Sequence, residues 1–242
     1  TRDLLEKKYD CKVILIQGPA GDIRPRYQQE NAEYLELHSF EAAKREMSEP
    51  DKKRYFSQSI QTLNKMSCTI YKALARVIDS LGPQQVTSLS MFSVERRFYA
   101  DVPGMEKACM IANEAKSEAD IDGMDWLNEV RKLRREGIDR QFSDIEIQYF
   151  IIDNGCICGI SNEVMSAIAL DILKKSDNPL LFFNGYTNGC NSYLPTAEEY
   201  DKGGYEVLRS NLIYYKYHGR VMSFNHDTGA RLADEVVRHW KE

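Results

Sequence analysis

The chain has 242 residues, of which 43% are hydrophobic and 29% are charged, a balance typical of a globular protein with a sizeable core. Its formal net charge of −5 argues against a nucleic-acid-binding protein, because such proteins use clustered positive charge to release counterions. No apolar run approaches the roughly 18–20 residues needed to cross a bilayer. We therefore expect neither nucleic acid as a partner nor a transmembrane segment.

The first third of the chain predicts one buried strand and one long helix. Residues 13–17 form an apolar run that ends at a Gly-Pro pair, which is typical of a buried strand followed by a turn. Residues 30–53 are highly charged with little periodicity, which indicates either a solvent-exposed helix or a mobile loop. Between residues 57 and 81 apolar side chains recur at helical spacing, and a second Gly-Pro pair ends that helix.

The middle of the chain predicts a strand, two helical faces and a hairpin. Residues 86–100 alternate between apolar and polar like a strand, and residues 103–137 have a helical composition with two apolar faces. Residues 144–152 alternate again. Because Asn-Gly is the strongest short hairpin signal, we expect this strand to pair with residues 156–160 around Asp153-Asn154-Gly155.

The last third predicts an apolar helix over residues 164–174, a short strand over 180–183 and a closing helix over 228–240. Strand–helix–strand alternation between residues 159 and 183 favours an α/β fold, with a layered mixed β-sheet flanked by helices. No repeat or low-complexity linker is visible, so residues 1–242 are taken as one domain. Neither a Gly-x-Gly-x-x-Gly nor a Walker pattern occurs, so no nucleotide cofactor is expected.

Six cysteines lie in or beside apolar segments with no disulfide-framework spacing. Cys156 and Cys158 alternate along a predicted strand and would face one side of it. A metal pair is the alternative, but zinc sites built from Cys normally have two such pairs or added His. We therefore expect buried free thiols, which favour a reducing compartment such as the cytoplasm.

The most informative stretch is residues 181–196, where a short apolar strand runs into an almost uncharged loop rich in Gly and Asn. The loop carries two tyrosines, Tyr186 and Tyr193. Loops at the ends of buried strands are where α/β enzymes place binding groups. The alternative is a turn whose tyrosines simply pack.

Three segments in this order carry a family resemblance. An apolar run precedes Gly21-Asp22-Ile23-Arg24-Pro25, a strand end at residues 159–162 reaches Glu163, and residues 188–193 end in Tyr193. Together they resemble the neutral/alkaline non-lysosomal ceramidase family, zinc-dependent amidases that hydrolyse N-acyl-sphingosine. That family has a Gly-Asp-x-Ser-Pro-Asn turn, a Pro-Gly-Glu segment and an Asn-x-Tyr-x-x-Tyr loop in the same order.

The resemblance implies that the chain is the C-terminal portion of a ceramidase-like catalytic domain, whose missing N-terminal half would be its partner. It also implies Zn²⁺ as the cofactor, with Glu163 and Tyr193 as metal ligands. The family carries two histidine ligands upstream of the Gly-Asp turn, so the remaining ligands are expected upstream of this chain. A hydrolytic zinc needs about three or four ligands and an open position for water.

The Gly-Asp turn supplies the candidate catalytic residues, Asp22 and Arg24. Arg24 stands where the family has its catalytic serine, and a guanidinium cannot act as a hydroxyl nucleophile. Either Arg24 clamps an anionic substrate group or the oxyanion, or it pairs with Asp22 or another acid and holds the turn. Asp22 would orient a ligand or cap the turn, since Asp readily bonds nearby backbone.

Two functions follow as hypotheses. The first is a zinc-dependent hydrolase of the neutral ceramidase type, in which a metal-bound water attacks a linear amide or ester and Tyr193 or Arg24 stabilises the oxyanion. The second is a non-catalytic ceramidase-like protein that has lost the serine and binds a lipid-like or glycan ligand. The substrate expected of the hydrolase is a small molecule or a lipid such as a sphingolipid. The four histidines show no metal-binding spacing and are not expected to be ligands.

Overall fold

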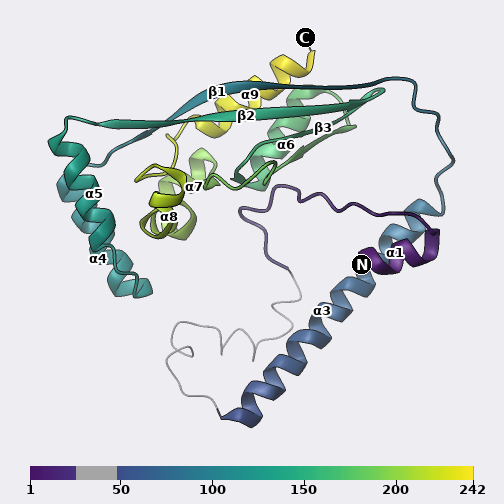
Figure 1. Cartoon of the computed structure of the whole chain (residues 1–242), viewed down its shortest axis with the longest axis horizontal. Coiled ribbons are helices and arrows are strands. Elements are labelled where there is room, and N and C mark those ends of the chain that lie inside the picture. Colours follow the sequence, from purple (N-terminus) through teal and green to yellow (C-terminus); the bar gives the residue numbers. More distant parts are fainter. Residues whose placement is uncertain (26–47, 242) are drawn as a thin grey trace. The chain divides into compact units, whose positions relative to one another are not determined.

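The structure, a computed structural model, describes residues 1–25 and 48–241 (Figure 1). These residues separate into two compact units. The first unit holds residues 1–16 and the described part of 24–85, and the second holds residues 17–23 and 86–241. The expectation of a single domain over residues 1–242 stays a prediction.

In the first unit, helix α1 (Arg2–Tyr9) contacts the long helix α3 (Glu49–Ile78). The N-terminal ammonium of Thr1 donates a 2.7 Å hydrogen bond to Ser67 Oγ, and Lys8 Nζ lies 2.6 Å from Asp79 Oδ2. Helix α3 starts earlier than the predicted residue 57 because Ser48 caps it, its hydroxyl accepting from a backbone N–H of the first turn. Among the described residues, no helix is long and apolar enough to span a bilayer.

The predicted buried strand over residues 13–17 is wrong. These residues form no strand in the structure, and Ile14 is 85% exposed. An apolar run becomes a buried strand only where a neighbouring strand takes its hydrogen bonds and another layer covers it, and the run meets neither condition among the described residues. Of the charged stretch 30–53, residues 30–47 lie outside the described residues, and the rest includes the first turn of α3.

The second unit is built on a four-stranded mixed sheet with the order β1-β2-β3-β5. The strands are β1 (Leu89–Asp101), β2 (Arg140–Ile152), β3 (Gly155–Gly159) and β5 (Leu181–Asn184). The first two pairings are antiparallel, and β3 pairs with β5 in parallel. As predicted, β2 and β3 form a hairpin at Asn154-Gly155, in which Asp153 takes the left-handed conformation with φ 50°.

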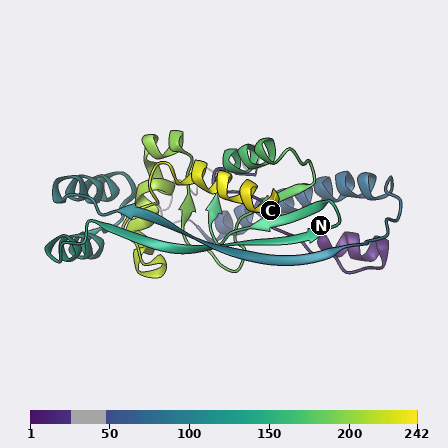
Figure 2. The same ribbon diagram turned by 90° about the horizontal axis from the view of Figure 1, so that it is seen from above.

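Two helices, α6 (Ser166–Ser176) and α9 (Thr228–Lys241), cover one face of this sheet, as Figure 2 shows. The fold is therefore the expected α/β arrangement of a mixed sheet flanked by helices. Alternate residues of the strands are buried against the helices, as the period of two requires. This core includes Ile145, Ile147, Tyr149, Cys156, Cys158, Leu181, Phe183, Ile168, Ile172, Leu232 and Val236.

The cysteine prediction is confirmed for Cys156 and Cys158, which are free and buried on the same face of β3. Burial raises the pKa of the Cys156 thiol to about 11, so both side chains behave as small apolar groups. Cys11, Cys68 and Cys109 are also free, but they are exposed.

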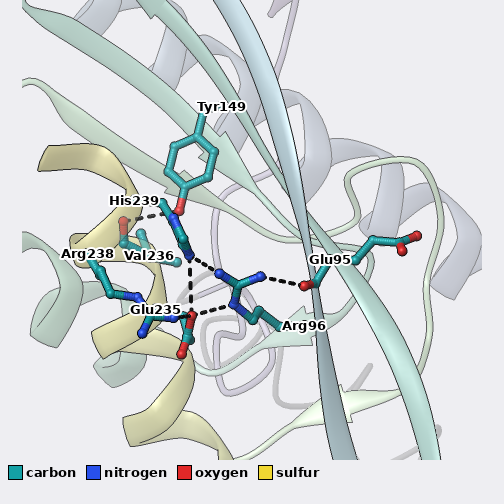
Figure 3. A network of polar contacts seen from close by, with 7 residues as sticks. All are labelled: Glu95, Arg96, Tyr149, Glu235, Val236, Arg238 and His239. Atoms are coloured by element: carbon teal, nitrogen blue, oxygen red, sulfur yellow. Dashed lines mark hydrogen bonds and ion pairs between the residues drawn. The ribbon is translucent and has the colours of Figure 1, made fainter. Parts of the chain in front are cut away.

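A network of charges fixes α9 to the edge strand β1 (Figure 3). Arg96 Nε donates a 2.5 Å hydrogen bond to the Glu235 carboxylate, which also pairs with Arg238. The side chain of His239 contacts both Arg96 and Glu235. Beside them the Tyr149 hydroxyl donates a 3.1 Å bond to the carbonyl of Val236, so the closing helix is held by directional bonds as well as by apolar packing.

A second core lies at the other end of the sheet, between α4 (Met105–Ala119), α5 (Met124–Arg135) and α8 (Ser210–His218). As predicted, these helices bury the two apolar faces that contain Ala108, Ile111, Ala112, Trp126, Val130 and Leu133. The indole N–H of Trp126 donates a 2.7 Å bond to the carbonyl of Val221. Helix α7 (Ala197–Lys202) and the π-helical segment η3 (Tyr205–Arg209) precede α8.

Candidate functional site

Two short strands bring the predicted metal ligands together. Strand β4 (Glu163–Val164) pairs in parallel with β6 (Tyr193–Leu194), and in this register Glu163 lies directly opposite Tyr193. Backbone bonds of 3.0 Å from Glu163 N to Ser192 O and 3.1 Å from Met165 N to Leu194 O hold the register. Neighbouring strands lie about 4.8 Å apart, so the carboxylate and the phenol are neighbours although 30 positions separate them in the chain (193 − 163).

Burial and the nearby Glu163 carboxylate raise the pKa of two phenols. Burial raises the pKa of Tyr193 well above its ordinary value, and the negative charge of Glu163 and the hydrogen bond to it add to the effect. The pKa of Tyr186 is also raised, by burial first and then by its hydrogen bond to Glu163. Both tyrosines are therefore neutral near pH 7, and the Glu163 carboxylate acts on both of them.

Glu163 and Tyr193 lie in the wall of a cavity of about 360 Å³. Its size is at the lower end of the range for small-molecule sites, about 300–1,000 Å³. Aromatic side chains make up much of the wall, and one carboxylate lies among them. The lining residues are Glu163, Cys190, Ser192, Tyr193, Tyr205, Ser210, Tyr214, Tyr217 and His218.

Helix α8 supplies four of the lining residues and was missed as a contributor to the site. Ser210, Tyr214, Tyr217 and His218 recur at intervals of four, three and one, so they share one face of the helix. The opposite face, which includes Leu212, is buried in the second core. In the sequence, the indication of this wall was the pair Tyr214 and Tyr217 on the side of the helix opposite its apolar face.

A buried arginine fixes the loop that leads into β6. Arg220 is fully buried and lies over the ring of Phe224, with its guanidinium carbon 3.7 Å from the ring centroid. Its Nη2 donates 2.8 Å bonds to Asn191 O and Ser192 Oγ, and its Nε donates to Ser143 Oγ at 3.0 Å. The arginine therefore anchors the two residues that precede Tyr193.

The same arginine affects His218. Burial lowers the pKa of His218 to about 4, and the positive charge of Arg220 acts in the same direction. At neutral pH the imidazole is therefore uncharged. Among the described lining residues, Glu163 is then the one acidic side chain, and no basic side chain there is charged.

Two glycines explain why the sequence motifs lie where they do. A Cβ on Gly185 would be 2.6 Å from the carbonyl oxygen of Asn162, and one on Gly21 would be 2.9 Å from that of Glu163. Gly21 N also donates a 2.8 Å bond to Val164 O. The Gly-Asp turn and the polar loop therefore both pack against the β4 segment, and both contacts require a residue without a side chain.

Asp22 lies at the start of α6 and does not line the cavity. Its Oδ1 accepts a 2.7 Å bond from the Ser166 backbone N–H, and its Oδ2 accepts a 2.9 Å bond from the Ser166 hydroxyl. Asp22 thus caps the helix that begins three residues after Glu163. Arg24 is exposed and belongs to the first compact unit. A catalytic role for Asp22 or Arg24 stays a prediction.

The cavity wall fits part of a zinc-binding set. A hydrolytic zinc takes three protein ligands and a water, and Glu163 with Tyr193 provides two oxygen donors. Tyr193 would have to lose its proton on binding, which a cation beside it would favour. Within residues 1–25 and 48–241 no group of three His, Cys, Asp or Glu side chains is arranged to hold a metal ion. The described residues therefore fit two of the ligands.

Comparisons with models of known protein families, with curated proteins and with solved structures found no match to this chain.

Proposed function

We propose that this protein is a zinc-dependent hydrolase of the neutral ceramidase type, which cleaves a linear amide or ester of a small-molecule or lipid-like substrate. The proposal is supported by the pairing of Glu163 with Tyr193 in adjacent strands at the wall of one cavity. The sequence motifs that led to these two residues do not by themselves require them to be neighbours.

Glu163 and Tyr193 would hold the zinc together with ligands from outside this chain, and the ion would supply an activated water. Tyr186 is close enough to Glu163 for the carboxylate to raise its pKa, and its hydroxyl would orient the carboxylate. Asp22 holds the start of α6 and thereby the β4 segment that carries Glu163. The aromatic wall would accept an apolar part of the substrate, and Arg24 remains the proposed partner of the oxyanion.

The test is metal content and turnover in the complete polypeptide. We expect one zinc per chain by inductively coupled plasma mass spectrometry and hydrolysis of a fluorogenic N-acyl amide. Glu163→Gln and Tyr193→Phe should each lower zinc occupancy and activity at least tenfold. Tyr200→Phe, outside the cavity lining, is the matched control and should change neither. Unchanged zinc content in both cavity variants, or a complete polypeptide without turnover, would count against the hydrolase.

A second candidate is a non-catalytic protein that binds its ligand in the same cavity. The observation in its favour is that no group of three His, Cys, Asp or Glu side chains within the described residues is arranged to hold a metal ion. The same metal analysis separates the two functions. A complete polypeptide that binds no zinc and turns over no amide, while ligand binding is lost on Glu163→Gln, would support the binding protein.

A further inference from the structure

Four tyrosines line the cavity, and their rings form its aromatic wall. The rings of Tyr193 and Tyr205 meet edge to face, with centroids 6.1 Å apart and planes 75° apart. Tyr214 and Tyr217 are 49% and 74% exposed, so they lie nearer the solvent than the half-buried Tyr193 and Tyr205. Rings at steep angles to one another present faces as well as edges to the space between them.

The carboxylate of Glu163 lies in the same cavity wall as these rings. The faces of phenol rings are electron-rich and attract cations. The wall therefore offers both ring faces and a carboxylate to a cation in the cavity.

The carboxylate of Glu163 has no cationic partner in the described part of the chain. Phenol hydroxyls satisfy it in part, but hydrogen bonds do not remove its charge. His218 in the same wall is neutral at pH 7. The buried Arg220 directs its donors to carbonyl and hydroxyl oxygens. The cavity therefore combines one negative charge with several aromatic rings.

We infer that the metal-free cavity binds an organic ammonium group, with the charged nitrogen between Glu163 and the tyrosine rings. Aromatic rings beside a carboxylate recognise alkylated ammonium ions because a diffuse cation is easily desolvated and is attracted by ring faces. The uncharged, largely aromatic remainder of the wall would hold the alkyl substituents. This inference goes beyond the proposed function and does not depend on it, because it requires neither zinc nor residues outside the chain.

The test compares choline with 3,3-dimethyl-1-butanol, which has the same shape without the charge. Isothermal titration calorimetry on the metal-free full chain should show choline binding at least tenfold more tightly than the neutral alcohol. Glu163→Gln should weaken choline binding at least tenfold. Tyr214→Ala should weaken it severalfold, whereas Tyr214→Phe should keep it, because the ring and not the hydroxyl makes the contact.

The control variant is Phe182→Ala, which removes an exposed aromatic ring on β5 away from the cavity lining and should leave choline binding unchanged. Circular dichroism confirms that each variant is folded. Equal binding of choline and the alcohol, or no choline binding at millimolar concentration, overturns the inference. Zinc binding without choline binding leaves the proposed function standing and removes this one. Choline binding without zinc does the reverse.

Discussion

Replacing Asp22 tests whether this residue acts as a helix cap. Its two carboxylate oxygens accept bonds of 2.7 and 2.9 Å from Ser166. Losing a side-chain cap costs about 0.5–2 kcal/mol, and losing a negative charge at a helix N-terminus costs about 0.3–1 kcal/mol at an exposed site. These two effects overlap, so we expect Asp22→Ala to lower the free energy of unfolding by about 1–2 kcal/mol. Asp22→Asn keeps an acceptor for the backbone N–H and should lose only about 0.5 kcal/mol.

Urea denaturation measures the total change, and amide hydrogen exchange locates it at the start of α6. The Ser166 amide should lose protection in Asp22→Ala and keep most of it in Asp22→Asn. Asp171→Ala is the control, since Asp171 lies on the exposed side of the same helix and pairs with Lys175; its loss should cost less than about 1 kcal/mol. If Asp22→Ala leaves both the unfolding free energy and the Ser166 exchange rate unchanged, Asp22 does not act as the cap of α6.

Three further results are expected. Gly185→Ala should lower the free energy of unfolding, measured by urea denaturation, by about 2–3 kcal/mol, because the added Cβ would lie 2.6 Å from the Asn162 carbonyl oxygen. Gly18→Ala is the control and should be nearly neutral, since nothing lies within 4 Å of its Cβ position. Similar losses of stability in the two variants would refute the clash. The pKa of His218 is lowered to about 4, so the folded state favours the neutral imidazole. The free energy of unfolding should therefore fall by up to about 3 kcal/mol as the pH drops from 6.5 to 4. His218→Gln should flatten this part of the stability–pH profile, and a profile identical to that of the wild type would contradict the lowered pKa. Arg220→Met should lower the free energy of unfolding by about 2–4 kcal/mol, since it leaves buried acceptors without a hydrogen-bond donor. Amide hydrogen exchange should become faster in the loop before β6. Exchange there at the wild-type rate would show that Arg220 does not hold this loop.

Much of the second unit was predictable because its elements carry strong local signals. Alternating apolar residues specified β2, the Asn154-Gly155 pair specified the hairpin, and helical spacing specified α9. Periodicity reports which face of an element is buried, and here each such face meets a covering layer. Residues 13–17 show the limit, because an apolar run says nothing about whether a partner strand exists.

The candidate site was predictable only in part. Glu163 and Tyr193 came from the motif resemblance, and their pairing across β4 and β6 is a tertiary fact that no spacing in the sequence encodes. Tyr214 and His218 were missed because they line the cavity only through the position of α8, and the buried face of that helix fixes this position. The charge state of His218 was equally out of reach, since it follows from burial and from Arg220.

The pairing of β4 with β6 involves only two residues from each strand. So short a pairing limits changes in the length of the loop that precedes β6. Adding or deleting one position between residues 185 and 192 would shift Tyr193 by one step, and its ring would then point to the opposite side of the strand. Substitutions in that segment conserve the spacing, and those away from Gly185, Tyr186 and Ser192 leave the contacts described above in place. Homologues of this protein should therefore vary in the composition of this loop far more readily than in its length.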